Sequence, residues 1–239
     1  MITFDEQQRV FHLKNKEISY LFSVEEGNIL SHLYFGPAIR NYHDERRYPR
    51  VDRGFSGNLP GSMDRTYSKD DLLQEYSGNN TGDYRVPAII IKTENGSRLT
   101  DFRYKSYKIL PGKPKLAGLP ASYVKSDKEA ETLEVTLVDE TIGAQLILSY
   151  TIYNERPVIT RNARLVNTSN QELRIEKIAS MQLDLTKHDY DVISVPGQYA
   201  LERQPERQEL RRGITEFSSR RNSSSHHMNP FVALVDKNT

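Results

Sequence analysis

The sequence contains no cysteine, which excludes disulfide bonds and zinc sites built from thiolates. It also has no apolar run of the roughly 18 residues that a membrane-spanning helix requires. Met1–Glu6 has neither the basic start nor the apolar core of a signal peptide. We therefore expect a protein of the reducing cytoplasm that has no membrane partner.

Neither sign of charge predominates. Lys and Arg together number 33, Asp and Glu together number 32, and the formal net charge is +1. A broad positive field, which would attract nucleic acid or an anionic membrane, is therefore not expected.

The common catalytic motifs are missing as well. There is no glycine loop for phosphate, no Gly-x-Ser-x-Gly elbow and no His-Glu-x-x-His. The neighbouring acids Asp70 and Asp71 do not by themselves create the spacing of a glycosidase pair. His226 and His227 would point to opposite sides of a strand, so they chelate poorly. We expect no metal site and no cofactor.

What the sequence does contain is a central group of strands. Three runs alternate apolar with more polar residues: Glu131–Val138, Ala144–Tyr153 and Val158–Val166. This two-residue period is typical of strands with one buried face. The connections between them are short and carry turn residues, which predicts an antiparallel meander.

Further patterns extend the sheet structure over most of the chain. Hairpins are predicted at 18–35, around Gly27-Asn28, and at 88–104, around Asn95-Gly96. The alternation over 173–185 requires a slip near Lys177, which indicates a bulge. One short helix is expected over Lys69–Glu75, with Ser68 as its cap. The predicted fold class is all-β, a large sandwich, and 239 residues can form it as a single domain.

Two long segments interrupt the strands, residues 36–85 and 190–225. Loops of such length inside a compact domain are uncommon unless they are functional. Their Asp and Arg residues allow two interpretations. They can be solvated surface ion pairs of small energetic value, or groups that bind the hydroxyls of a polar ligand or contact a partner subunit.

The last predicted strand, Pro230–Val235, lies close to the end of the sequence. An edge strand can end a domain in this way. The alternative is that the sequence is a piece of a longer chain, and this alternative is supported by a family resemblance.

Many short motifs, in one order from about residue 18 to 235, resemble the N-terminal domain of bacterial α-galactosidases of glycoside hydrolase family 36. They are Pro49–Ser56, Asp64–Ser68, Leu73–Tyr76, Gly82–Ala88, Asp101–Lys105, Gly112–Pro120, Glu129–Leu133, Ser223–His226 and Asn229–Phe231.

The resemblance implies a galactose-mutarotase-like β-supersandwich over residues 1–239. It also implies a catalytic (β/α)₈ barrel, with both catalytic aspartates, downstream of Thr239. A retaining glycosidase requires two carboxyl groups about 5 Å apart, and no residue of this chain is assigned to either role. The implied partners are α-galactoside oligosaccharides such as melibiose and raffinose, and further copies of the chain in a homo-oligomer, most simply a tetramer.

Three residues match family positions that contact sugar. Asp52 and Arg65 correspond to groups thought to project into the sugar pocket of a neighbouring subunit. Tyr199 stands where the family often has a tryptophan, a departure that keeps an aromatic plane but shrinks it. Carboxylate and guanidinium groups bind sugar hydroxyls in well-defined pairs.

Two functions of different classes follow. The chain is either the non-catalytic domain of an α-galactosidase, or a free-standing carbohydrate-binding or assembly module with no enzyme attached. The motif series favours the first.

Overall fold

The structure is a computed structural model that describes residues 1–238 except 44–47, 49, 53–56, 60, 61, 80, 81, 119, 120, 187, 188 and 222–226. The chain divides into two compact units, unit 1 (Met1–Asp184) and unit 2 (Leu185–Thr239). The prediction that residues 1–239 act as a single domain stays a prediction, and each unit is described by itself.

The first sheet of unit 1 has four antiparallel strands in the order of the sequence. They are β1 (Ile2–Asp5), β2 (Val10–Lys14), β3 (Ile18–Glu25) and β4 (Ile29–Pro37). The β3–β4 hairpin confirms the prediction around Gly27-Asn28, where a 3₁₀ turn, η1 (Glu26–Asn28), joins the strands. Gly27 has φ +69°, and a Cβ there would lie 2.8 Å from Arg103 Nη1. Glycine is therefore required both by the backbone angle and by this close approach.

The second sheet contains the predicted meander. Its order is β6-β7-β8-β9, all antiparallel. The strands are β6 (Arg103–Pro111), β7 (Ala130–Asp139), β8 (Ala144–Tyr153) and β9 (Ile159–Asn167). A third 3₁₀ turn, η3 (Asp127–Glu129), precedes β7 and has a complete capping box between Ser126 and Glu129.

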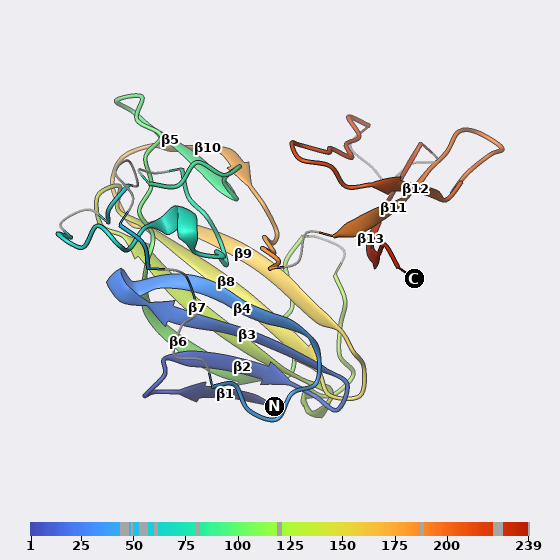
Figure 1. The fold of residues 1–239 in the computed structure, drawn as a ribbon, viewed down its shortest axis with the longest axis horizontal. Helices are drawn as coiled ribbons and strands as arrows, with labels where there is room; N and C mark the ends of the chain where they lie inside the picture. Colours follow the sequence, from blue (N-terminus) through green and yellow to red (C-terminus); the bar gives the residue numbers. More distant parts are fainter. Residues whose placement is uncertain are drawn as a thin grey trace. The chain divides into compact units, whose positions relative to one another are not determined.

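The two sheets lie face to face as the layers of a sandwich (Figure 1). Apolar residues at alternate positions of β2, β3, β7 and β8 form one continuous buried cluster between them. Phe22 of the first sheet and Tyr150 of the second are stacked with ring centroids 5.0 Å apart. The all-β sandwich predicted from the alternation is confirmed.

The predicted hairpin at 88–104 is wrong. β5 (Ile89–Thr93) pairs with β10 (Leu173–Ile178), far along the chain, and the segment after the turn joins no ladder until β6. Of the turn residues only Gly96 has a positive φ, whereas a type I′ turn needs two such residues. The predicted bulge near Lys177 is confirmed, because the β5–β10 register shifts between Ile175 and Lys177.

The helix expected over Lys69–Glu75 is shorter than predicted. It is a 3₁₀ turn, η2 (Lys69–Asp71), and the Ser68 hydroxyl bonds to the Asp70 side chain instead of capping the backbone. The chain then turns toward β4: Leu73 O accepts a hydrogen bond from His32 N at 2.6 Å, and Gln74 bridges Ser31. Pairing with a strand thus replaces the further helical turn.

Unit 2 contains a three-stranded antiparallel sheet in the order β12-β11-β13. The strands are β11 (Tyr190–Pro196), β12 (Glu206–Glu209) and β13 (Met228–Asp236). The strand predicted at Pro230–Val235 is confirmed. The description of 190–225 as irregular is wrong in part, since β11 and β12 lie within it. Every residue of β12 is exposed, so no apolar alternation marks that strand.

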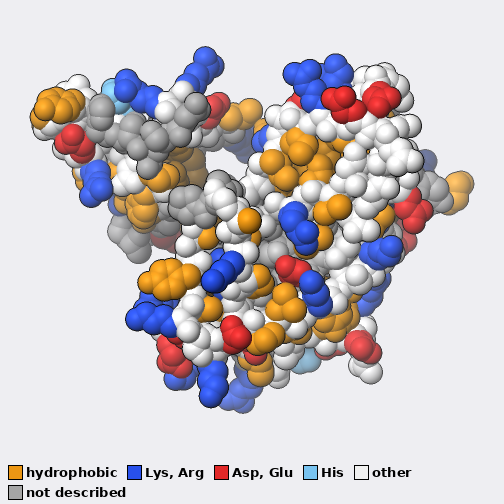
Figure 2. Space-filling view, turned by 180° about the vertical axis from the view of Figure 1, so that it is seen from behind, with side chains coloured by type: hydrophobic (Ala, Val, Ile, Leu, Met, Phe, Trp, Pro, Cys, Tyr) orange, Lys and Arg blue, Asp and Glu red, His pale blue; other side chains and the backbone are white. Residues whose placement is uncertain are grey.

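No helix among the described residues is long and apolar enough to cross a membrane. On the side of the molecule in Figure 2, basic and acidic side chains are interspersed among polar and apolar ones. This distribution agrees with the formal net charge of +1.

Candidate functional site

Asp52 and Arg65, two of the three residues predicted to bind sugar, lie together in unit 1. Arg65 Nη2 is 3.2 Å from Asp52 Oδ1, and each side chain is 57% exposed. An ion pair this exposed contributes little to stability, because water screens both groups. The pair therefore has polar atoms directed toward solvent that could bind the hydroxyls of a ligand.

A second arginine fixes the loop beside this pair. Arg50 contacts Asp64 at 2.7 Å and Glu26 at 3.0 Å, and it donates to the Tyr48 hydroxyl at 2.9 Å. Its guanidinium lies 5.0 Å from the centroid of the Tyr67 ring, a cation–π contact. These bonds join the loop to η1 at the end of the β3–β4 hairpin.

Hydrogen bonding also sets the charge of Asp64. The Thr66 hydroxyl and backbone N–H donate to Asp64 Oδ1 at 2.6 and 2.8 Å. These bonds, together with Arg50, hold the pKa of Asp64 below its ordinary value. The carboxylate next to Arg65 in sequence is thus kept ionised.

The loop has a small core of its own. Ile29, Leu59, Tyr67 and Leu72 form a separate buried apolar cluster. Tyr67 is fully buried, and its hydroxyl donates to Glu26 O at 2.8 Å. Burial raises the pKa of the Tyr67 phenol, so the group stays a neutral donor.

The deepest anchor of the loop is Glu75, which is fully buried between the two sheets. Its carboxylate accepts hydrogen bonds from Tyr20 at 2.7 Å, Tyr150 at 2.8 Å and His32 Nδ1 at 2.8 Å. Arg161 Nη2 lies 3.1 Å from Oε2. His32, which is 3% exposed, is therefore a hydrogen-bonded histidine in the core.

Charge in this network is balanced despite its burial. Burial opposes ionisation of Glu75, but the charge of Arg161 and the hydrogen bonds from His32 and Tyr20 outweigh it, so the pKa of Glu75 is lowered. Arg161 also donates to the Gln182 carbonyl and to the Tyr20 hydroxyl. The network thereby joins β3, β4, β8 and β9 to the loop.

Two further ion-pair groups hold the same loop. Lys69, nearly fully buried, bonds Asp101 at 2.8 Å, and Arg103 bonds the other oxygen of Asp101 at 2.9 Å. Arg85 binds Asp83 at 2.7 Å and also pairs with Asp184. The loop is thus tied to the sandwich by buried or half-buried charges at several points.

Tyr199, the third predicted residue, belongs to unit 2 and is 84% exposed. It lies in a tight turn closed by the bridge between Gln198 and Leu201, in which Ala200 has φ +62°. The exposure is compatible with a ligand-facing ring. Its predicted role in sugar binding stays a prediction.

Sequence reasoning missed the Glu75–Arg161 network. Arg161 shares the inward face of β9 with Ile159, Ala163 and Leu165. An arginine at a position that the alternation of side chains assigns to the core indicates a buried charge, and this could have been seen in the sequence. Glu75 gave no such signal, because it fell within the expected helix.

The described residues of unit 1 form a two-layer β-sandwich that carries an anchored polar loop. The family model of the glycosyl hydrolase family 36 N-terminal domain matches residues 28–239. The chain belongs to this family, which confirms the resemblance.

The similar proteins agree. The chain is 51% identical over 239 residues to alpha-galactosidase 1 of Pediococcus pentosaceus, and 52% identical to alpha-galactosidase Mel36A of Lactobacillus acidophilus. Each match includes 100% of this chain but 33% of the relative. The chain therefore spans about a third of the length of these relatives.

Solved structures show the same fold. The α-galactosidase AgaB of Geobacillus stearothermophilus matches 100% of this chain and 32% of its own, with a TM-score of 0.94 and 44% identity. A variant of α-galactosidase AgaA from the same organism, in complex with raffinose, matches 96% of this chain and 32% of its own, with a TM-score of 0.92 and 46% identity.

Proposed function

We propose that this chain is the N-terminal, non-catalytic part of a retaining α-galactosidase. The whole enzyme would release terminal non-reducing α-D-galactosyl residues from oligosaccharides such as melibiose and raffinose. Both catalytic carboxyl groups would belong to a barrel that follows residue 239. The chain would contribute to subunit assembly, most simply in a homotetramer, and to the rim of the sugar pocket.

Relatives and structural neighbours support the substrate class. The curated relatives that cover this chain are α-galactosidases, and two neighbouring structures hold raffinose and stachyose. Both sugars carry further units beyond the terminal galactose. A domain outside the catalytic barrel is well suited to contact those additional units.

One observation carries the proposed role in recognition: the exposed Asp52–Arg65 pair stands on a loop whose other end is anchored by buried charges. An anchored loop holds a polar pair in place before the ligand arrives, which lowers the entropy cost of binding. We propose that Asp52, Arg65 and Tyr199 recognise sugar units beyond the galactosyl group, in the same or an adjacent subunit.

The test compares two substrates in the full-length enzyme. Asp52→Ala should lower kcat/KM for raffinose by about ten- to a hundredfold, the loss of one charge-assisted hydrogen bond of ~1.5–3 kcal/mol. A small aryl α-galactoside, which lacks the additional units, should be much less affected. Glu140→Ala, an exposed acid in the β7–β8 turn, is the matched control. Equal losses on both substrates, or a change in oligomer size, would contradict the recognition role.

The isolated chain of residues 1–239 should release no aryl group from an α-galactoside above the buffer rate, because neither catalytic carboxyl group is expected in it. Turnover that persists through repurification would contradict the assignment of catalysis to a following barrel.

The alternative function is a free-standing carbohydrate-binding or assembly module. The reading frame that follows Thr239 in the gene separates the two. A continuing frame that encodes a barrel supports the enzyme, and a stop codon there supports the module.

A further inference from the structure

The outer face of the second sheet carries a groove that the loop of Asp52 and Arg65 does not form. Along β8, Leu148, Tyr150 and Ile152 point into the core, so the residues between them face outward. Two neighbouring pockets, of about 580 and 550 Å³, follow this outer face and share Ala121 and Ser122 in their walls. The groove extends from Arg164 on β9 to Val158 directly before that strand, about 20 Å at ~3.3 Å per residue.

The connector between β6 and η3 forms the wall of this groove. At its start, the Thr132 hydroxyl donates to Gly112 O at 2.8 Å. At its end, Tyr153 donates to Tyr123 O at 3.4 Å, and Glu129 accepts from the backbone of Lys125 and Ser126. The wall is therefore attached to the sheet at both ends.

The larger pocket has a polar floor whose hydrogen-bonding capacity is unused. The side chains of Ser149, Thr160 and Asn162 line it and have no hydrogen-bond partner among the residues the structure describes. These three residues are half-buried. Glu134 Oε2 is buried there without a hydrogen bond of good geometry to any described residue, although Lys108 Nζ lies 2.8 Å away. A buried carboxylate oxygen is normally satisfied by hydrogen bonds from protein, water or a ligand.

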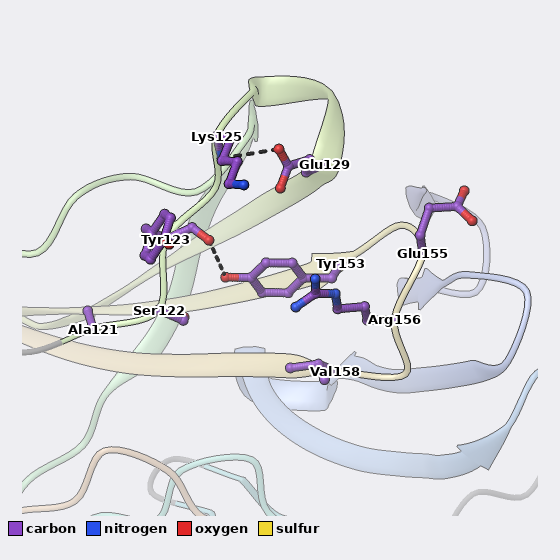
Figure 3. A pocket seen from close by; sticks show the side chains of 9 residues that line it. All are labelled: Ala121, Ser122, Tyr123, Lys125, Glu129, Tyr153, Glu155, Arg156 and Val158. Atoms are coloured by element: carbon purple, nitrogen blue, oxygen red, sulfur yellow. Dashed lines mark hydrogen bonds between the residues drawn. The ribbon is translucent and has the colours of Figure 1, made fainter.

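The smaller pocket presents aromatic and apolar surface (Figure 3). The Tyr153 ring lies across it with its hydroxyl toward the Tyr123 backbone, and Val158 adds to the same side. The Arg156 guanidinium points toward this pocket and has no side-chain partner in the described part of the chain. A flat apolar surface beside a planar donor suits a sugar ring, which has a C–H face and a hydroxyl edge.

The charged side chains that line the larger pocket bear on whether its ligand is neutral or anionic. Lys113, Lys115 and Arg164 line the larger pocket and would attract an anion. The Glu134 carboxylate in the floor forms an ion pair with Lys108 at 2.8 Å and can also accept hydrogen bonds from hydroxyl groups. The carboxylate of Glu134, the hydroxyl of Ser149 and the amide of Asn162 together offer donors and acceptors, which match vicinal sugar hydroxyls better than a single phosphate.

We propose that the groove formed by the outer faces of β7, β8 and β9 and by residues 113–117 and 121–123 binds a neutral oligosaccharide. The larger pocket holds sugar hydroxyls through Glu134, Ser149 and Asn162. The smaller pocket holds a sugar ring against Tyr123 and Tyr153. The site does not depend on the proposed hydrolysis.

Hydrogen exchange of the full-length protein, followed by mass spectrometry, tests this locally. Saturating raffinose, or maltotriose as a sugar without galactose, should slow exchange in the peptides that cover 113–125 and 145–164. Binding at a catalytic site elsewhere protects other peptides, so the two functions can fail independently. No change in these peptides with either sugar would overturn the proposal, and so would protection by inorganic phosphate alone.

Variants make the test specific. Asn162→Ala and Tyr123→Ala should each raise the sugar concentration needed for half-maximal protection about tenfold, the effect of one lost hydrogen bond or ring contact. Tyr84→Ala is the matched control for Tyr123→Ala, since the two rings are 82% and 72% exposed and Tyr84 does not line the groove. Undiminished protection in both groove variants would overturn the site.

Discussion

Two carboxylate–guanidinium pairs in unit 1 have almost the same length and opposite environments. Glu75 and Arg161 are 3.1 Å apart and 0% and 5% exposed, whereas Asp52 and Arg65 are 3.2 Å apart and 57% exposed. Charges attract far more strongly in a protein interior than in water, but burying them first costs their hydration. The surroundings, rather than the distance, therefore decide what each pair does.

The buried pair is compatible with a stable core because every group around it is satisfied. Tyr20, Tyr150 and His32 complete the bonds of the carboxylate, and backbone carbonyls complete those of the guanidinium. Among the described residues, the exposed pair has no such set of hydrogen-bonding neighbours, and both side chains are 57% open to solvent. One pair holds the loop in place, and the other is the part of the loop that remains available for a ligand.

Breaking the buried pair should have the largest effect. Glu75→Ala leaves Arg161 as an uncompensated charge in the core, and we expect the free energy of unfolding to fall by about 3–5 kcal/mol. Chemical denaturation of the full-length protein would measure this. Glu140→Ala serves as the control and should change the value by less than about 0.5 kcal/mol. A similar small loss for Glu75→Ala would mean that the network does not hold the sandwich together.

Breaking the half-buried pair of Lys69 and Asp101 should have an intermediate effect on the free energy of unfolding. Asp101→Ala leaves buried Lys69 without its carboxylate partner and should cost about 1–3 kcal/mol. Burial already lowers the pKa of Lys69, against the opposing effect of Asp101. Removing Asp101 lowers that pKa further. The deficit should therefore be fully present at neutral pH and shrink as pH rises and Lys69 loses its proton, which denaturation at several pH values would show.

His12 is a single buried group rather than a charged pair, and it shows how burial acts on a side chain that is neutral in the folded protein. Burial, with help from Lys14, lowers the pKa of His12 to about 4. Its ring shares a hydrogen bond of 2.9 Å with Ser19. Folding favours the neutral ring, so this stability is present above pH 6.5 and is lost as pH falls toward 4. His12→Gln should remove about 3 kcal/mol of the pH dependence between these values, since one pKa unit corresponds to ~1.4 kcal/mol. An unchanged acid profile would contradict the assignment.

Breaking the exposed pair should have the smallest effect on stability. Asp52→Ala should change the free energy of unfolding by less than about 1 kcal/mol, since water screens both groups. Thermal unfolding beside the raffinose assay separates stability from recognition. A large loss of stability would show that the pair holds the loop and that its availability to ligand is secondary.

The β7–β9 meander was predictable for a local reason. Val135 and Leu148 face each other in the β7–β8 ladder and alternate with polar residues along their strands. Only one face of each strand can therefore be buried, which fixes the register. The β3–β4 hairpin was also predictable, because Gly27 and Asn28 accept the positive φ angles of the turn. The motif series was sufficient for the family.

The candidate site was predictable only in part. The family pattern pointed to Asp52 and Arg65, but their ion pair is formed by side chains thirteen positions apart in a loop without periodicity. Nothing in the local sequence indicates that Glu75 lies among Tyr20, Tyr150 and Arg161, which come from three different strands. The same limit explains the wrong hairpin, since Ile89–Thr93 found its partner in β10.

The sequence by itself determined the β7–β9 meander, the β3–β4 hairpin, the sandwich class and the family, because side-chain alternation and turn chemistry act between near neighbours. Only the tertiary structure decided which charges are buried, which strand completes β5, and that the outer faces of β7, β8 and β9 form a groove beside residues 113–117 and 121–123. These outcomes depend on desolvation and on contacts between segments far apart in the sequence, such as Tyr20 and Arg161, which are 141 positions apart. Such contacts exist only after the sheets have packed.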